Sequence, residues 1–337
     1  MREIHTEDAE WLRSYYRHFA RVEAAEVSPR YAEWAAGLAA DDDVVELLMR
    51  LPAAKRQPNL VFAAARVHGA PLRDWTTTAR HLTEHWEEVA TTIMERRTQT
   101  NEAGRIAVLN YAFSRIAEGA GKPLALVEVG ASAGLTLYPD AWPIRYISDA
   151  AEDQVLAPRG PLVASGQLEC RLEGLEAPPR LPEVGWRAGV DLNPLDLRRD
   201  DDRRWLEALV WPGMEHRVDR LTAGAELLRQ DPPQLFAGDL NERLAEVLAR
   251  VPAGTVPVVF HSAVLVYLAG AERARFVEQL RSAGVRWVSN EGVSVLPEVA
   301  AQVPGEDPHA EGFILALDGE PLARTGPHGQ YLRRLAA

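Results

Sequence analysis

The feature that most constrains this fold is a change of hydrophobic pattern at Pro123. Before it, apolar residues recur at helical spacing, as in segment 11–22. After it, short apolar runs bounded by turn residues alternate with helical segments, which is typical of a parallel sheet covered by helices on both faces. The sequence therefore predicts an α/β protein with a helical region over residues 1–120 and a mostly parallel sheet over residues 121–337.

Five apolar runs carry the sheet prediction. They are LALVEVG (124–130), WRAGVDLNP (186–194), QLFAGDL (234–240), VPVVFHSAVLVYL (256–268) and VRWVSN (285–290). Asp318-Gly319 marks a closing hairpin, expected to add an antiparallel strand at or near one edge of the sheet. Residues 135–185 are read as an insertion, in which LVASGQLECRLEG is the segment expected to form β structure.

The composition of the chain argues against several classes of function. Lys and Arg number 37 against 49 Asp and Glu, a net charge of −12, which argues against a nucleic-acid partner. The segment MREIHTEDAEW lacks the apolar core of a signal peptide, and no apolar run is long enough to span a membrane. A single cysteine, Cys170, excludes an intramolecular disulfide. We expect a cytoplasmic protein without nucleic-acid or membrane partners.

Two chemistries compete for LVEVGASAGL, residues 126–135. Gly-x-Ser-x-Gly is the nucleophile elbow of serine hydrolases, with Ser132 as nucleophile. Later acids and histidines that could complete a triad are Asp191, Asp239, His261, His309 and His328. Against this interpretation, an α/β-hydrolase places several strands before the elbow, whereas the first 120 residues here are predicted to be helical.

The other chemistry is a cofactor loop between a strand and a helix. Gly130 and Gly134 let a ligand approach the backbone closely. Their Gly-x-x-x-Gly spacing lacks the dinucleotide fingerprint, so no pyrophosphate is expected there. Glu128, at the end of the strand, suits a cationic group. S-adenosylmethionine carries an ammonium and a sulfonium group and no phosphate, so it fits this pattern.

Acids at the ends of two further strands agree with this choice. Asp191 in GVDLNP is suited to ribose hydroxyls, with Asp149 as the reserve, and Asp239 in AGDL is suited to an adenine amino group. Open α/β sheets bind ligands outside the carboxyl ends of their strands. The predicted cofactor contacts are Glu128, Gly130, Ser132, Gly134, Asp191, Asn193, Asp239 and Leu240.

LVEVGASAG, GVDLNP, AGDL and VVFHSAVLVYL, in this order, resemble class I S-adenosylmethionine-dependent methyltransferases over residues 124–290. This resemblance implies a Rossmann-like sheet, the cofactor S-adenosylmethionine and methyl transfer to a small-molecule acceptor. The sequence departs from that family at Ser132, where the loop usually has glycine, and in the 135–185 insertion. A closer resemblance covers nearly the whole chain. KRQPNL, TQTNEAGR, VWPG, HSAVLVYL and PHGQYLRRL resemble an uncharacterised bacterial family, DUF2332, which implies no particular reaction.

His261 is the catalytic candidate. It follows VVF near the carboxyl end of an expected central strand, where it would serve as a general base or orient the acceptor. The alternative is a buried histidine bonded to its surroundings. Candidates for substrate contact are Asn101, Glu102, Arg105, Ser262 and Glu291. The first three would act as a lid over the cofactor, or they simply begin a solvated helix.

His81-Leu-Thr-Glu84-His85 matches an inverted zinc-peptidase motif. Zinc requires at least three protein ligands, and no later segment identifies a third, so no metal site is predicted. Besides methyl transfer, three alternatives remain open: a non-catalytic protein that binds S-adenosylmethionine or a partner, a serine hydrolase acting through Ser132, and this zinc peptidase.

Overall fold

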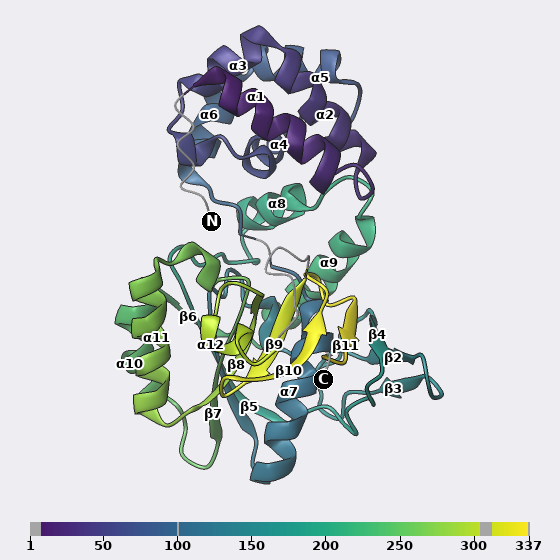
Figure 1. Cartoon of the computed structure of the whole chain (residues 1–337), viewed down its shortest axis with the longest axis vertical. Helices are drawn as coiled ribbons and strands as arrows, with labels where there is room; N and C mark the ends of the chain where they lie inside the picture. Colours follow the sequence, from purple (N-terminus) through teal and green to yellow (C-terminus); the bar gives the residue numbers. More distant parts are fainter. Residues whose placement is uncertain (1–7, 100, 304–311, 336–337) are drawn as a thin grey trace. The chain divides into compact units, whose positions relative to one another are not determined.

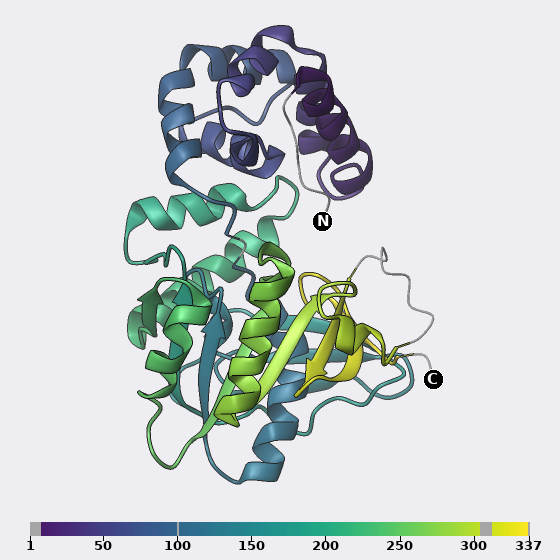
Figure 2. The ribbon, with the colours of Figure 1, turned by 60° about the vertical axis from the view of Figure 1, so that its left-hand side comes forward.

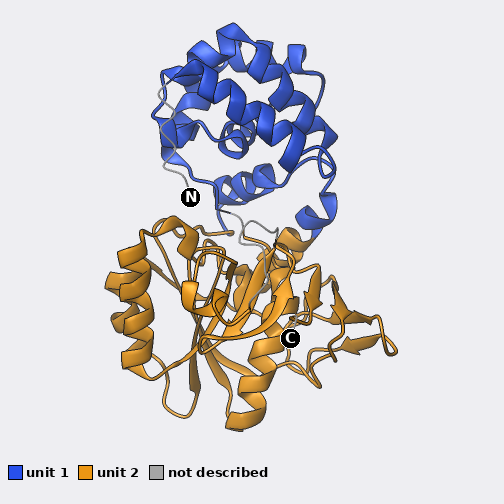
Figure 3. Ribbon diagram, viewed as in Figure 1, with its two compact units in different colours: residues 1–100, 198–219 blue, residues 101–197, 220–337 orange. Residues whose placement is uncertain are grey.

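The computed structural model describes residues 8–99, 101–303 and 312–335 (Figure 1). The chain divides into two compact units: unit 1 comprises residues 1–100 and 198–219, and unit 2 comprises residues 101–197 and 220–337 (Figure 3). Helix α7 (Arg105–Ala120) therefore groups with the sheet of unit 2, although its sequence pattern resembles that of the helices before it. No helix of the described residues has the length and apolar character needed to cross a membrane.

Unit 1 is helical, as the sequence predicts. Its helices are α1 (Ala9–His18), α2 (Pro29–Ala40), α3 (Asp42–Met49), α4 (Pro58–Val67), α5 (Trp75–Glu84), α6 (Trp86–Glu95) and α8 (Asp200–Leu209). Ser28 caps α2, whose first residue is Pro29. His85 leaves helical geometry and separates α5 from α6. Helix α9 (Glu215–Gln230) runs from unit 1 into unit 2.

Unit 2 contains the sheet. Its strands are β1 (Leu124–Val129), β2 (Ile144–Ser148), β3 (Gln154–Leu156), β4 (Leu168–Glu173), β5 (Val184–Asp191), β6 (Gln234–Ala237), β7 (Val256–Ser262), β8 (Arg286–Gly292), β9 (Phe313–Leu317), β10 (Glu320–Thr325) and β11 (Tyr331–Arg333). They are arranged in the order β3-β2-β4-β11-β10-β9-β8-β7-β1-β5-β6. All five runs that carry the sheet prediction are strands, and together they form one continuous parallel block, β8-β7-β1-β5-β6.

The order of the parallel strands reverses at β1. From β1 the chain proceeds outward through β5 and β6, and it then returns to add β7 and β8 on the other side of β1. Such a reversal is a topological switch point, and open α/β sheets bind ligands in the crevice beside the carboxyl ends of the strands there. In this protein those carboxyl ends carry Val129, Asp191 and Ser262.

The two faces of the sheet are covered by different helices. One face packs on α10 (Leu240–Leu248) and α11 (Gly270–Ala283), which come forward in Figure 2, and carries Val127 and Val259. The other face packs on α7, where the ring centroids of Phe113 and Phe260 lie 5.2 Å apart. Glu128 is aligned with Phe260 in the register of β1 and β7, so its side chain belongs to the α7 face.

Two expectations about the fold are wrong. The closing hairpin does form at Asp318-Gly319, but it lies inside the sheet, because β11 pairs with β4 and the insertion continues the sheet beyond it. The helix expected after Gly134 is also absent: β1 is followed by a short 3₁₀ turn, Leu135–Leu137, and then by β2. The loop after β1 is therefore not a strand-to-helix turn of either predicted kind.

Candidate functional site

The loop after β1 is tightly wound and almost fully buried. Gly130, Ser132 and Gly134 have φ angles of 72°, 51° and 82°, in the left-handed region. A Cβ atom added to Gly130 would lie 2.3 Å from Cγ2 of Val264, which follows β7. Only glycine therefore fits at residue 130, and Val264 covers its Cα.

Side chains from two other segments hold this loop in place. Asn101 Nδ2 donates to the carbonyl of Ala131 over 3.2 Å, and its Oδ1 accepts from the backbone N–H of Leu135 over 3.0 Å. Asp191 Oδ2 accepts from the N–H of Ser132 over 2.8 Å, while Oδ1 accepts from the N–H of Asn193 over 2.8 Å. Asn101, Asp191 and Asn193 therefore lie together around the loop, where the side chains of Asn101 and Asp191 fix its backbone geometry.

Glu128 is the buried acid of this edge, with 5% of its surface exposed. Its Oε1 accepts a short hydrogen bond from the Thr136 hydroxyl, whereas Oε2 has no hydrogen-bond partner among the described residues. Burial raises the pKa of Glu128 to about 8, a shift that Thr136 and the charge of Arg105 oppose and that of Asp191 reinforces. The Ser132 hydroxyl is likewise buried and unpartnered within the described residues.

His261 is fully buried and lies on the opposite face of the sheet from Glu128. Its Nδ1 lies 2.7 Å from Glu291 Oε1, and its Nε2 accepts from the indole N–H of Trp287 over 2.9 Å. Nε2 is therefore the acceptor, and Nδ1 carries the proton that it donates to Glu291. Both nitrogens are engaged, which matches the structural alternative for His261 and gives it no route to an acceptor.

Glu291 also shapes the segment that covers Gly130. Its Oε1 accepts from the backbone N–H groups of Val264 and Leu265, over 2.9 and 3.1 Å, in addition to His261. The pair His261 and Glu291 thereby positions the turn after β7. Ala263 in this turn has a φ of 59°, so the turn is locally strained.

The candidate substrate residues also lie at this edge of unit 2, and they bond to the protein. Arg105 donates from Nη1 to the Ser262 carbonyl and from Nε to the Pro327 carbonyl, each over 2.9 Å. Glu102 is buried, and its Oε1 accepts from the N–H of Gly104 over 2.8 Å and from Arg220 Nε over 2.9 Å. The Ser262 hydroxyl accepts from the Asn290 amide over 2.9 Å.

Two predicted cofactor contacts lie at the end of β6. Asp239 caps α10 and accepts from the N–H of Asn241 over 2.8 Å, while Leu240 is buried in the core cluster beneath α10. The reserve residue Asp149 lies elsewhere, in the insertion, where its carboxylate accepts from the N–H of Gly174.

The described residues do not form the side-chain arrangements that the hydrolase and zinc-peptidase alternatives require. The Ser132 hydroxyl contacts no histidine among the described residues, although its positive φ is the strain that an elbow serine needs; His309 lies outside those residues. His81 Nε2 is bonded to the His68 carbonyl over 2.9 Å. Within the described ranges, no group of three or more His, Cys, Asp or Glu side chains could hold a metal ion.

Sequence reasoning missed Thr136 and Arg187. Thr136 gave no signal, because nothing in a lone threonine indicates that it will bond a buried carboxylate. Arg187 did give one: it is a charged residue inside the buried run WRAGVD, and a buried guanidinium requires partners.

A protein-family model described as "Uncharacterized protein conserved in bacteria (DUF2332)" matches residues 13–334, nearly the whole chain. This match confirms the closer of the two resemblances. No curated protein matches the chain significantly.

Proposed function

The chain belongs to this bacterial family, and we propose that it binds S-adenosylmethionine at the carboxyl ends of β1, β5 and β7 and transfers the methyl group to a small-molecule acceptor. The observation that carries the proposal is the Glu128 Oε2 atom, which is buried at the switch point of the sheet and has no partner in the described part of the chain. A buried, unsatisfied polar atom costs about 1–3 kcal/mol, which a ligand that supplies a donor recovers. A methyltransferase-like Rossmann arrangement of unit 2 is part of the same proposal.

The residues at this edge fit such a ligand. Glu128 would face the ammonium group, and a nearby cation would favour its ionised form. Asp191 accepts the backbone N–H groups of Ser132 and Asn193 beside the loop after β1, and in this proposal it faces the ribose hydroxyls. Asp239 accepts one backbone N–H, and a carboxylate offers about four acceptor positions, so it can also accept from an adenine amino group. Leu192, 62% exposed after β5, offers an apolar contact for the base.

When bound beside Glu128, Asp191 and Asp239, S-adenosylmethionine would supply a sulfonium methyl group for in-line transfer to the acceptor, with its sulfur leaving as a thioether. The protein contributes mainly by holding the two molecules in line and by excluding water. His261 is not assigned a role in proton removal, because Glu291 and Trp287 engage both of its nitrogens. An acceptor that attacks through a neutral amine or a thiolate needs no protein base before the transfer.

Ligand entry requires the turn after β7 to move. Val264 covers Gly130, and Glu128 Oε2 and the Ser132 hydroxyl are shielded from solvent. We therefore expect Val264→Ala to bind S-adenosylmethionine more tightly than the wild type, with a faster association rate. Stopped-flow binding kinetics measure this difference, and slower or weaker binding by the variant would contradict a covering role for Val264.

The main test is calorimetric titration of the full chain with S-adenosylmethionine and with its demethylated product. Wild-type protein should bind both, and Glu128→Gln should lose about tenfold in affinity for S-adenosylmethionine, as expected for removal of a charge-assisted contact. The matched control is Glu87→Gln, an exposed glutamate of α6 in unit 1. Absence of binding at millimolar ligand overturns the proposal. Fluorophosphonate labelling of Ser132 would favour the hydrolase instead.

A second candidate is a non-catalytic protein that binds the same ligand. The full engagement of His261 favours it, because both ring nitrogens of the predicted base are already bonded within the protein. Incubation with S-adenosylmethionine labelled in its methyl group and a bacterial small-molecule extract separates the two. Methylated products that depend on Glu128 support transfer. Binding without any turnover supports the second candidate.

A further inference from the structure

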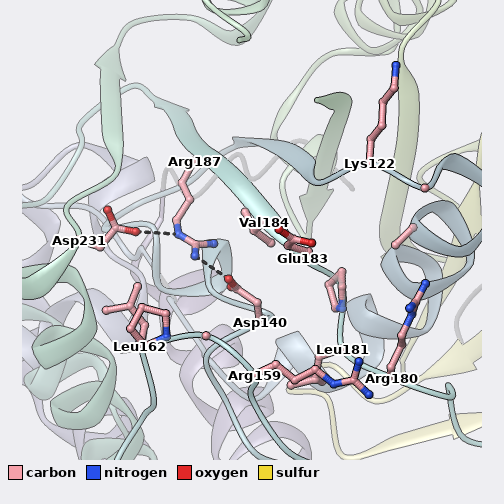
Figure 4. A pocket seen from close by; sticks show the side chains of 15 residues that line it. Lys122, Asp140, Arg159, Leu162, Arg180, Leu181, Glu183, Val184, Arg187 and Asp231 are labelled. Carbon is pink, nitrogen blue, oxygen red and sulfur yellow. Dashed lines mark hydrogen bonds and ion pairs between the residues drawn. The ribbon is translucent and has the colours of Figure 1, made fainter. Parts of the chain in front are cut away.

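Unit 2 contains a cavity of about 660 Å³ that none of the predicted sites uses (Figure 4). It lies between the last turn of α7, the first half of β5 and loops of the 135–185 insertion. Arg187, in its wall, precedes Asp191 on β5 by four residues, which is roughly 13 Å along a strand. The cavity is therefore separate from the carboxyl-end edge where we propose that S-adenosylmethionine binds.

One wall of the cavity is formed by the paired charges of Arg187, Asp140 and Asp231. Arg187 pairs with Asp140 over 2.8 Å and with Asp231 over 3.2 Å, and it donates to the Leu137 carbonyl over 2.8 Å. Its guanidinium also lies over the ring of Tyr138, 4.6 Å from the centroid. Figure 4 shows this cluster with both acids reaching Arg187. The cluster holds one cation and two acids, so this wall carries a formal charge of −1.

The remaining charges of the lining are mostly positive. Lys122, Arg159 and Arg180 line the cavity, and within the described part of the chain their side chains make no hydrogen bond or ion pair. Among the described residues that line the cavity, Glu183 is the one acid outside the Arg187 cluster. These cations come from three separate segments of a chain whose net charge is −12. All three residues are exposed, so their side chains are available to an anion that enters the cavity.

We propose that this cavity is a second ligand site, which binds a small organic phosphate. A guanidinium forms paired hydrogen bonds with phosphate or carboxylate oxygens. A planar carboxylate is satisfied by one such fork, whereas a phosphate presents acceptors in several directions. Two arginines and a lysine from different segments suit the phosphate better. The volume limits the ligand to a small molecule.

The proposal is tested by titrating the full chain with pyrophosphate at constant ionic strength. We expect binding by the wild type and a loss of about tenfold in affinity for both Arg159→Gln and Arg180→Gln. Both side chains are exposed, so the fold should persist. Arg275→Gln on α11 is the matched control, since it removes an exposed arginine that lies outside the cavity and should bind pyrophosphate like the wild type.

Three outcomes would overturn the proposal. The first is no pyrophosphate binding by the wild type at millimolar concentration. The second is equal loss of affinity in Arg275→Gln, which would indicate attraction by overall charge. The third is citrate binding as tight as pyrophosphate, which would assign the cavity to carboxylates. None of these results depends on whether S-adenosylmethionine binds, so the two proposals fail separately.

Discussion

At the scale of single residues, the surroundings of Glu128 shift its pKa and thereby its charge. It is buried on the α7 face of β1, and Thr136 is its one direct partner among the described residues. Desolvation disfavours its ionised form and places its pKa in the folded protein near 8, against an ordinary value of 4.5. The folded protein therefore holds a proton on Glu128 at pH 6, where an unfolded chain has released it.

This difference makes stability depend on pH. The stability that neutral Glu128 contributes is fully present below pH 4.5 and is lost as the pH rises through 8. Over that range the unfolded chain releases a proton that the folded protein keeps, which favours unfolding. The side chain of Glu128→Gln stays neutral. We therefore expect its free energy of unfolding, relative to that of the wild type, to rise by about 1 kcal/mol per pH unit between pH 5 and 8. Urea denaturation of both proteins measures this gain. Parallel stability curves would show that the pKa of Glu128 is not raised.

Gly329 is a second residue whose identity the structure dictates. Its φ is 83°, and an added Cβ would lie 2.0 Å from the carbonyl oxygen of Gly104, just before α7. We expect Gly329→Ala to lower the free energy of unfolding by about 3 kcal/mol, through backbone strain and overlap together. In Gly121→Ala the φ of 60° is similar but no atom lies within 4 Å, so its cost should stay near 1 kcal/mol. Equal losses in chemical denaturation would contradict the steric explanation.

At the scale of elements, Asn101 joins the segment before α7 to the loop after β1. It bonds Ala131 and Leu135 at once, so the loop has a fixed anchor near its start and another near its end. We expect Asn101→Ala to speed amide exchange at Leu135 by about tenfold, as loss of roughly 1 kcal/mol of hydrogen bonding implies. Exchange at Val127 in β1 is the internal control. Unchanged protection at Leu135 would show that packing alone holds the loop.

The strands of the parallel sheet were predictable because each is a short apolar run bounded by turn residues. The hairpin was predictable because Asp318 and Gly319 both adopt positive φ, as a tight turn between strands requires. The turn after Gly134 was not predictable. The small residues that permit a helix there equally permit a 3₁₀ turn, and the choice depends on Asn101 and Thr136, which act through tertiary contacts.

In the candidate site, too, the positions of some residues were predictable from the sequence and the roles of others were not. Strand ends placed Glu128, Asp191 and Ser262 at one edge, because carboxyl ends of parallel strands meet there. The role of His261 was not predictable from type and position, since a histidine at a strand end can face either side of a sheet. Register assigns it to the face opposite Glu128, and the indole of Trp287 occupies its second nitrogen.

At the scale of the whole molecule, β11 joins the insertion to the rest of the sheet. It pairs with β10 on one side and β4 on the other, and Leu332 in its centre is fully buried. A chain ending at Gln330 should lose about 2–5 kcal/mol of stability, the range for truncating a buried leucine, and protection from exchange in β4. A chain ending at Arg334 keeps β11 and serves as the control. Equal protection of β4 in both truncated chains would show that β11 is dispensable.

This late strand has a consequence for the nascent protein. Arg333 of β11 pairs with Glu173 of β4 across 160 residues of sequence. At ribosomal speeds of about 5–20 residues per second, an interval of roughly 8–32 s separates the synthesis of the two. Throughout that interval one side of β4 has no strand beside it, and such an open edge invites pairing with other chains. We expect the cell to shield this protein with chaperones during translation, chiefly along β4.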